Sequence, residues 1–272
     1  MFSARLNPTF AQNSPMISKA QISFVNSLKL KKHRQSGKLF VAEGEKIVNE
    51  LLASPMQIAY IMASRAWIES HPGLANQHLS KIVETPEAAM AKISSLSTPS
   101  PVLAVVHMPG LVKPVYNAQD LYLGLDEIQD PGNLGTIIRI CDWFGITNLI
   151  CSIGCADLFN PKTIQASMGA FLRVHVFYSQ LDDEIENYRS VTGHAVYGTF
   201  LEGDNIYETE LPSGGFVVMG NEGKGINPQI EQRITHKLYI PSFSLSPVHA
   251  ESLNVSVATA ITCSEFMRRR RK

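Results

Sequence analysis

Residues 121–139 read LYLGLDEIQDPGNLGTIIR, and this stretch sets the architecture of the second half of the chain. The apolar run 121–125 predicts a strand, the proline and glycines at 131–135 predict a turn, and residues 137–144 predict a helix. Turns of this kind often hold a phosphate or a cofactor at the start of the helix. Arg139 lies in the first turns of that helix, where the helix dipole disfavours a cation. We therefore expect an anionic partner near Arg139, although the spacing NxGxxxR taken alone also fits a plain tight turn.

Length and composition place the chain among globular proteins with one large or two modest domains. It has 272 residues, of which 44% are hydrophobic, and no stretch approaches the apolar length of a membrane span. The four cysteines, at 141, 151, 155 and 263, form no paired framework, which favours a reducing, cytoplasmic setting. Cys151 and Cys155 lack a second Cys/His pair at a familiar spacing, so we expect no metal site. Residues 1–15 are interpreted as a disordered leader ahead of an alternative start at Met16, with a transit peptide as the less favoured alternative.

The net charge of zero hides a strong segregation of charge. Residues 1–42 contain seven Lys or Arg and no acidic residue, and residues 268–272 read RRRRK. The segment 43–267 therefore carries the remaining 12 of 24 basic residues together with all 24 acidic residues. Basic ends can be merely solvated, but two of them in one chain favour a polyanionic partner such as nucleic acid.

Periodicity divides the chain into two α/β halves. Residues 17–34 have apolar residues at roughly helical spacing, with Lys29, Lys31, Lys32 and Arg34 at one end as candidate RNA-binding residues. The remaining elements predicted in the first half are strands 39–42, 57–62, 81–83 and 103–107 and helices 45–52, 66–70 and 86–94. In the second half we predict strands 121–125, 148–151, 173–177, 194–199, 215–219 and 237–240, and a last helix at 253–270. The predicted organisation is a leader (1–15), a first α/β domain (16–107), a linker (108–114) and an α/β domain with a mostly parallel sheet (115–272).

Two further loops carry unusual polar residues. The apolar strand ending at Met219 is followed by Gly220-Asn-Glu-Gly-Lys-Gly225, whose glycines let a backbone approach a ligand closely. Its spacing is that of neither a Walker A loop nor a dinucleotide fingerprint. The third loop ends in SLNVSVATA, residues 252–260, which reads as a capped helix start with an apolar face of small residues.

Taken together and in order, NxGxxxR, GNEGKG and IP…SLNVSVATAI resemble the SpoU (TrmH-type) ribose 2′-O-methyltransferases of the SPOUT superfamily. The resemblance extends over nearly the whole chain from residue 17, because the first half is similar to the small L30e-like substrate-binding domain of many members. It implies a deep trefoil knot in the C-terminal part of the parallel-sheet domain, a homodimer, and transfer of a methyl group from S-adenosylmethionine to a ribose 2′-hydroxyl, with no metal. By the same resemblance the cofactor pocket is formed by Thr199, Met219, Gly220, Ile240 and Leu253.

The resemblance also implies roles for the polar residues of the three loops. Arg139 acts on the ribose-phosphate, and the residues that orient Arg139 and the RNA backbone are Asn133, Glu222, Ser252 and Asn254. Since the pKa of an arginine is far above neutral, clamping a phosphate and stabilising negative charge is the more conservative role for Arg139. Glu222 is expected to neutralise and position that guanidinium.

The loop between Pro241 and Ser252 departs from the family pattern. Ten residues, SFSLSPVHAE, separate Pro241 from Ser252, and this loop (242–251) is longer than usual and lacks a glycine. Ile240 is therefore the less secure cofactor contact, and His249 fits a solvated loop residue better than a substrate contact.

A separate N-terminal domain favours rRNA over tRNA as substrate. The alternatives are a tRNA methyltransferase, a non-catalytic RNA-binding ribosome-assembly factor, and an enzyme acting on small molecules.

Overall fold

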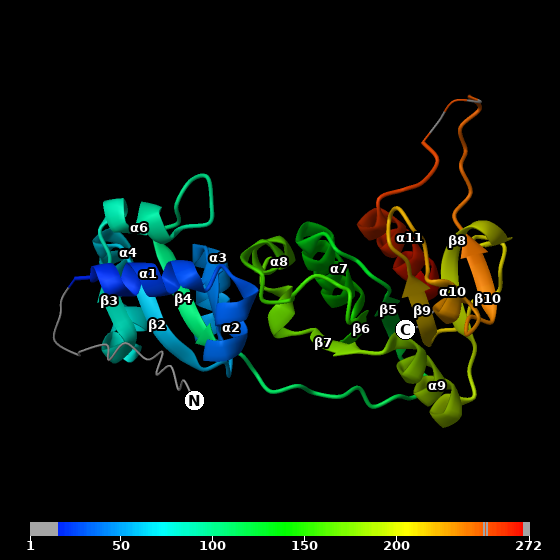
Figure 1. The fold of residues 1–272 in the computed structure, drawn as a ribbon, viewed down its shortest axis with the longest axis horizontal. Helices are drawn as coiled ribbons and strands as arrows, with labels where there is room; N and C mark the ends of the chain where they lie inside the picture. The colour runs from blue at the N-terminus through cyan, green and yellow to red at the C-terminus, as the bar shows by residue number, and fades with distance from the viewer. Residues whose placement is uncertain (1–15, 247, 249, 269–272) are drawn as a thin grey trace. The chain divides into compact units, whose positions relative to one another are not determined.

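The computed structural model describes residues 16–246, 248 and 250–268, and the chain forms two compact units (Figure 1). The predicted leader, His249 and the end of the C-terminal basic run lie outside the described residues. Unit 1 comprises residues up to Gly110 together with 159–169, and unit 2 comprises 111–158 and 170 onward. None of the described helices combines the length and the apolar character that a membrane crossing requires.

Unit 1 contains a four-stranded mixed sheet in the order β1-β4-β2-β3. Its strands are β1 (Leu39–Glu43), β2 (Ile58–Ala63), β3 (Ile82–Glu84) and β4 (Val102–His107). β4 pairs antiparallel with both β1 and β2, whereas β2 and β3 run parallel. Its helices are α1 (Lys19–Ser27), α2 (Lys31–Gly37), α3 (Glu45–Leu52), α4 (Arg65–Ser70), α5 (Pro72–Gln77), α6 (Glu87–Ile93) and α8 (Pro161–Ser167), with a short 3-10 turn at Leu79–Lys81. Four β-strands and helices 45–52, 66–70 and 86–94 were predicted near these positions, but α5 was not.

The amino-terminal segment is two helices rather than one. Leu30, in extended conformation and 61% exposed, separates α1 from α2, while Ser18 caps α1 through a reciprocal pair of hydrogen bonds with Gln21. Arg34 packs inside this corner with 1% of its surface exposed. Its Nη1 donates to the carbonyl oxygens of Leu28 (2.9 Å) and Lys29 (2.8 Å), which satisfies the carbonyls left over at the end of α1.

Unit 2 contains a six-stranded sheet in the order β10-β8-β9-β5-β6-β7, and every pairing in it is parallel, as predicted. Its strands are β5 (Leu121–Leu125), β6 (Asn148–Ser152), β7 (His175–Ser179), β8 (Val196–Asn205), β9 (Gly215–Met219) and β10 (His236–Tyr239). Its helices are α7 (Pro131–Phe144), α9 (Leu181–Thr192), α10 (Pro228–Glu231) and α11 (Val255–Arg268), with a 3-10 turn at Ala170–Leu172.

The centre of unit 2 is apolar because β5 and β9, which pair in the middle of the sheet, are buried at every position. An aromatic group packs around Phe216, with Tyr116, Tyr122 and Tyr188 within 6.5 Å between ring centroids. Gly124 leaves room for this group, since a Cβ there would lie 2.7 Å from a ring carbon of Phe216. The sheet is therefore closely packed near the carboxyl edge that presents the polar loops.

Candidate active site

The first loop of the site joins β5 to α7 and places Asn133 on the first turn of that helix. Pro131 occupies the first helical position, where its missing N–H costs nothing. The side chain of Asp130 caps the helix by accepting a hydrogen bond from the Asn133 backbone N at 2.9 Å. The backbone of Asn133 is thereby held at the start of α7, at the carboxyl edge of the sheet.

Four polar side chains from three distant segments meet there. Asn133 Nδ2 donates to Glu222 Oε1 at 2.5 Å, and Asn254 Nδ2 donates to the same oxygen at 2.9 Å. The Oδ1 of Asn133 accepts from Asn254 Nδ2 and from Ser256 Oγ, both at 3.1 Å. Asn254 also caps α11, since its Oδ1 accepts from the Ser256 backbone N at 3.0 Å. We call Asn133, Glu222, Asn254 and Ser256 the polar cluster.

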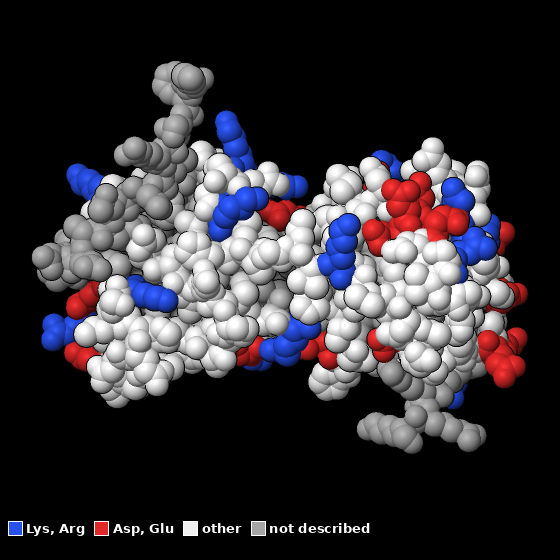
Figure 2. Space-filling model, turned by 90° about the horizontal axis from the view of Figure 1, so that it is seen from below, with Lys and Arg blue, Asp and Glu red and all other residues white. Residues whose placement is uncertain are grey.

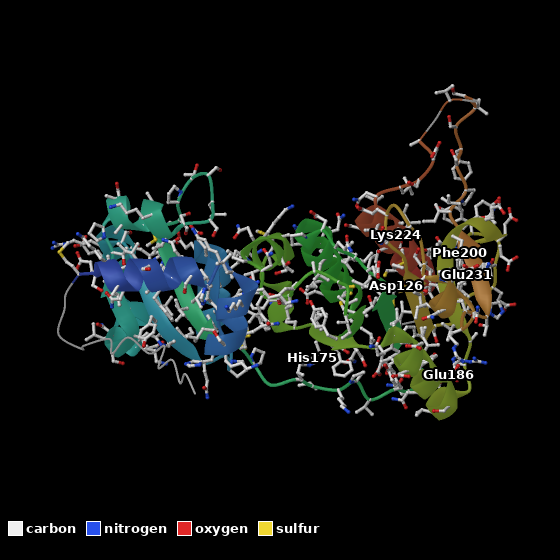
Figure 3. All side chains as sticks on the ribbon, viewed as in Figure 1. Asp126, His175, Glu186, Phe200, Lys224 and Glu231 are labelled. Carbon is white, nitrogen blue, oxygen red and sulfur yellow. The ribbon has the colours of Figure 1, made fainter. Side chains whose placement is uncertain are left out.

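The loop that carries Glu222 is tied to the end of β5. Asp126 Oδ2 accepts from the Asn227 backbone N at 2.7 Å, and Asn221 Nδ2 donates to the Glu127 carbonyl at 2.8 Å. Lys224 forms an ion pair with Glu127 at 3.6 Å, and Figure 3 labels Asp126 and Lys224 on these two segments. Glu127 has a φ of 52°, a strained conformation for a residue with a side chain. The two hydrogen bonds and the ion pair tie the loop that carries Glu222 to the end of β5.

Burial changes the ionisation of Asp126, which is 4% exposed. Burial raises the pKa of its carboxyl above the ordinary value of 3.8, while the hydrogen bond from Asn227 acts in the opposite direction. A carboxyl that holds a loop through a backbone N–H therefore does so at an electrostatic cost near neutral pH.

Arg139 lies on the same helix as Asn133 but is joined to no member of the polar cluster by a hydrogen bond or an ion pair. It is exposed on α7, and within the described part of the chain it makes no hydrogen bond and no ion pair. The expected pairing of Glu222 with Arg139 is wrong for this structure, because the Glu222 carboxylate accepts from two carboxamides instead. The guanidinium is left available to an anion from outside the chain.

The third loop contributes a different serine from the expected one. Ser252 is exposed and makes no hydrogen bond to any described residue, whereas Ser256 joins the polar cluster. Ser256 was missed because it falls in the apolar run after Asn254. Ser256 lies two residues after the helix cap Asn254, inside the motif SLNVS, and this spacing could have identified it.

The expected cofactor residues are brought together only in part. Thr199 Oγ1 lies 3.6 Å from the sulfur of Met219, so β8 and β9 bring these two side chains into contact. Gly220 follows Met219, and a Cβ there would lie 2.5 Å from two backbone atoms of Gly225 and Ile226. Ile240 is half-buried just beyond β10 and Leu253 is 47% exposed, so both have apolar surface free. Residues 241–246, which follow Ile240 in the sequence and precede Leu253, extend away from the sheet (Figure 1).

A polar hollow of about 320 Å³ opens beside the polar cluster. Its lining comes from the β5–α7 loop (Ile128, Gln129 and Asp130) and from residues 220–225 after β9, here called the glycine loop (Asn221, Glu222 and Gly223). The described residues include no group of three or more His, Cys, Asp and Glu that could hold a metal ion. The four cysteines are free and buried. The site offers hydrogen-bond acceptors and donors, and α7 adds the exposed guanidinium of Arg139, a group that suits binding of an anionic substrate.

The predicted RNA-binding residues of unit 1 divide into two groups. Lys31 and Lys32 are exposed at the start of α2, while Lys29 is half-buried and donates through Nζ to the Ser94 carbonyl at 2.8 Å. The prediction for Arg34 is wrong, because its guanidinium is buried against backbone carbonyls and cannot reach a ligand.

The acidic first turn of α9 (Asp182, Asp183 and Glu184) belongs to unit 2, and Figure 2 shows acidic side chains gathered over that unit.

Comparison with known proteins gives a consistent result over both units. Residues 120–264 match the model of the SpoU rRNA methylase family, and residues 19–104 match that of the MRM3-like substrate binding domain. The 23S rRNA (guanosine(2553)-2'-O)-methyltransferase RlmP of Bacillus subtilis is 33% identical over 238 residues, which is 86% of this chain and 90% of that protein. The 23S rRNA (uridine(2479)-2'-O)-methyltransferase of Streptomyces viridochromogenes is 26% identical over 198 residues, covering 70% of this chain and 68% of that protein.

Solved structures agree with the fold. A Porphyromonas gingivalis protein assigned to the TrmH family of RNA methyltransferases superposes with a TM-score of 0.82 at 40% identity, covering 93% of this chain and 99% of that one. An AdoMet-bound rRNA methyltransferase from Sinorhizobium meliloti has the same fold, with a TM-score of 0.81 at 24% identity over 95% of this chain and 98% of that one. The family suggested by the three loops is thereby confirmed: the chain belongs to the SpoU rRNA methylase family.

Proposed function

We propose that this protein transfers a methyl group from S-adenosylmethionine to a ribose 2′-hydroxyl of RNA, with ribosomal RNA as the substrate. The observation that carries the proposal is the polar cluster together with Arg139, which lies on the same helix as Asn133, is exposed and has no ionic partner among the described residues, in a chain that belongs to the SpoU rRNA methylase family. The similarity to RlmP over most of both chains supports rRNA in preference to tRNA.

The residues around the end of β9 fit a sulfonium cofactor. Gly220 keeps the backbone bare after Met219, Ile240 and Leu253 leave apolar surface free to contact an adenine, and the Glu222 carboxylate supplies negative charge nearby. When bound, S-adenosylmethionine supplies an activated methyl group on a positively charged sulfur. We assign Thr199, Met219, Gly220, Ile240 and Leu253 to its binding.

In the reaction the S–CH₃ bond breaks as an O–CH₃ bond forms at the ribose, and the hydroxyl proton is lost to solvent. A 2′-hydroxyl is a weak nucleophile, so groups that stabilise its developing negative charge accelerate the step. Arg139 binds the adjacent phosphate and stabilises that charge, since a guanidinium remains protonated throughout. Asn133, Glu222 and Asn254 hold one another in position through their shared hydrogen bonds and orient the ribose, and Ser256 completes this arrangement. Ser252 is assigned to the RNA backbone.

The two units are assigned different tasks. The domain of residues 16–107, with an L30e-like fold, binds the RNA substrate through Lys29, Lys31 and Lys32, and residues 108–114 link it to the methyltransferase domain of residues 115–272. The match of residues 19–104 to a substrate-binding domain supports this division.

We further propose a knotted homodimer that works in the cytoplasm. The trefoil knot is proposed from the resemblance to the family. Four free cysteines suit a reducing compartment. The dimer, through unit 2, follows from the resemblance to the family alone.

The test uses labelled S-adenosylmethionine, the purified full-length protein, and rRNA and tRNA separated from cells that lack the gene. The RNA is digested and the labelled nucleoside identified. A labelled 2′-O-methylnucleoside in rRNA is the expected result, and the same label in tRNA alone would replace the substrate with tRNA. Absence of label from naked RNA and from ribosomal particles, combined with no cofactor binding, would refute the proposal in favour of a non-catalytic RNA-binding factor.

A further inference from the structure

One of the two tryptophans of the chain has no place in the core. Trp67 is 3% exposed and stacks on His71, whereas Trp143 near the end of α7 is 84% exposed. Within the described residues the Trp143 ring makes no aromatic contact and no hydrogen bond. A single exposed apolar side chain needs no explanation by itself, so its position relative to the site decides whether it has a role.

Trp143 lies on the same face of α7 as Arg139. The residues of α7 that point into the core are Leu134, Ile137, Ile138 and Cys141, and the opposite face exposes Thr136, Arg139 and Trp143. Arg139 and Trp143 are four residues apart, so they are neighbours on the helix surface, about 6 Å apart along its axis. That rise is close to the spacing of successive nucleotides in an extended single strand.

The charges around Trp143 favour an anion rather than oppose it. Asp142, the neighbouring acid, is occupied by a two-pronged ion pair: Arg173 Nε donates to its Oδ1 at 2.9 Å and Nη2 donates to its Oδ2 at 2.8 Å. Arg139, by contrast, has no acidic partner among the described residues. Proteins commonly bind single-stranded RNA by stacking its bases on aromatic rings and placing basic side chains along its phosphates, so an indole next to a guanidinium is suited to this ligand.

A second copy of this chain fits the face less well. A protein partner that covered Trp143 would also desolvate Arg139 and would have to supply an acid to pair with it. Resting on the proposed function, we propose that Trp143 is a substrate-binding residue: its ring stacks on the base of a nucleotide adjacent to the target ribose, while Arg139 binds the phosphate between them.

The composition of the chain allows a direct spectroscopic test. Trp67→Phe removes the other tryptophan, and because the buried Trp67 Nε1 has no hydrogen-bond partner among the described residues, the change removes none of the hydrogen bonds seen in the structure. The emission of the full-length Trp67→Phe protein then reports Trp143 alone. The probe is a single-stranded oligouridylate or oligoadenylate. Stacking predicts quenched emission that saturates with the oligonucleotide, and protection of the ring from acrylamide.

Variants separate stacking from general damage. Trp143→Ala should weaken oligonucleotide binding by about tenfold, the loss expected for one stacked base, and Trp143→Phe should restore most of it. In the methylation assay the same loss should appear in the KM for RNA, with kcat at saturating RNA within a few-fold of the wild type. Val191→Ala, at a 60% exposed position on α9 of the same unit, is the matched control and should bind like the wild type.

Two results would overturn the inference. One is oligonucleotide binding and KM unchanged in Trp143→Ala. The other is emission that is already shielded without RNA and that changes with protein concentration, which would assign Trp143 to the contact between two copies of the chain. Failure of the wild-type protein to methylate any RNA refutes the proposed function instead, and leaves the fluorescence result to be judged by itself.

Discussion

Asn133 and Glu222 are 89 residues apart in the chain, and the Asn133 carboxamide donates a hydrogen bond to the Glu222 carboxylate. This contact joins the β5–α7 loop to the glycine loop after β9, and Asn254 adds the start of α11 by donating to the same carboxylate oxygen. Each of the three sequence motifs of the family therefore contributes side chains to one hydrogen-bonded cluster. Glu222 works as an acceptor that arranges two amides, because it makes no ion pair with Arg139 in the described structure.

Substituting Glu222 separates its role as an acceptor from its charge. Glu222→Gln keeps an oxygen that can accept from both carboxamides, so we expect it to retain methyl transfer within about tenfold of wild type. Glu222→Ala leaves the amides of Asn133 and Asn254 without their shared acceptor and should lose about 10- to 100-fold in kcat/KM. Steady-state kinetics with saturating cofactor measure both. Equal loss in the two variants would show that the charge, and not the hydrogen bonds, is what the site needs.

Arg139→Ala should abolish most of the methyl transfer, by about 100- to 1000-fold, because a group that stabilises developing charge is removed. Binding of S-adenosylmethionine, measured by calorimetry, should stay within a few-fold of wild type. Arg139→Lys keeps the charge but loses the two-pronged geometry, so we expect intermediate activity. A parallel loss of cofactor affinity in Arg139→Ala would contradict the role assigned to this residue.

Much of the fold was predictable because its central strands are buried on both faces. The bounds of β5 and β9 match the predicted ranges 121–125 and 215–219, since apolar runs flanked by turn residues leave little choice. β8 was predicted to end at Thr199 but continues to Asn205. Its exposed end is held by pairing with β10, with a register shift between Lys237 and Leu238. Pairing with a distant strand leaves no signal in the local sequence.

The site was predictable as a set of motifs and not as a set of contacts. Asn133, Glu222 and Asn254 were identified together, and the structure brings them together. Ser256 was missed because its local pattern is that of a packed helix. Arg34 was assigned to RNA because it follows two lysines, yet the break between α1 and α2 turns it inward. Composition gives the charge of a segment, whereas the direction of one side chain depends on helix boundaries.

Gly220→Ala should weaken cofactor binding and destabilise the domain. The added methyl would lie 2.5 Å from backbone atoms of Gly225 and Ile226, so the loop must shift, at a cost of about 1–3 kcal/mol in the free energy of unfolding. Gly223→Ala is the matched control in the same loop, because its Cβ would have only Asn221 Oδ1 nearby, at 3.7 Å. Thermal unfolding and cofactor titration measure the two effects. The interpretation fails if Gly223→Ala is the more damaging change.

Asp126 should make stability depend on pH in the direction opposite to a salt-bridged acid. Its folded-state pKa lies above the ordinary value of 3.8, so its contribution to stability is full below that value and is lost as the pH rises through the folded-state pKa. Asp126→Asn cannot ionise and still offers an oxygen to the Asn227 N–H. The stability of this variant relative to wild type, measured by urea unfolding, should therefore increase as the pH rises above the ordinary value of 3.8. Asp126→Ala leaves that N–H unpaired and should lose about 1–3 kcal/mol throughout.

The exposed lysines of α2 should contribute to RNA binding through phosphate contacts. Replacing Lys31 and Lys32 together by alanine removes two exposed charges without touching the buried Arg34 that closes the corner between α1 and α2. Each lost phosphate contact should reduce the slope of log affinity against log salt by about 1, so binding should weaken most at low salt. Lys92→Ala, at an exposed position on α6 of the same unit, is the control for a general effect of charge. Cofactor affinity should be unchanged, since the cofactor residues belong to unit 2. An unchanged salt slope in the double variant would exclude α2 from the RNA-binding surface.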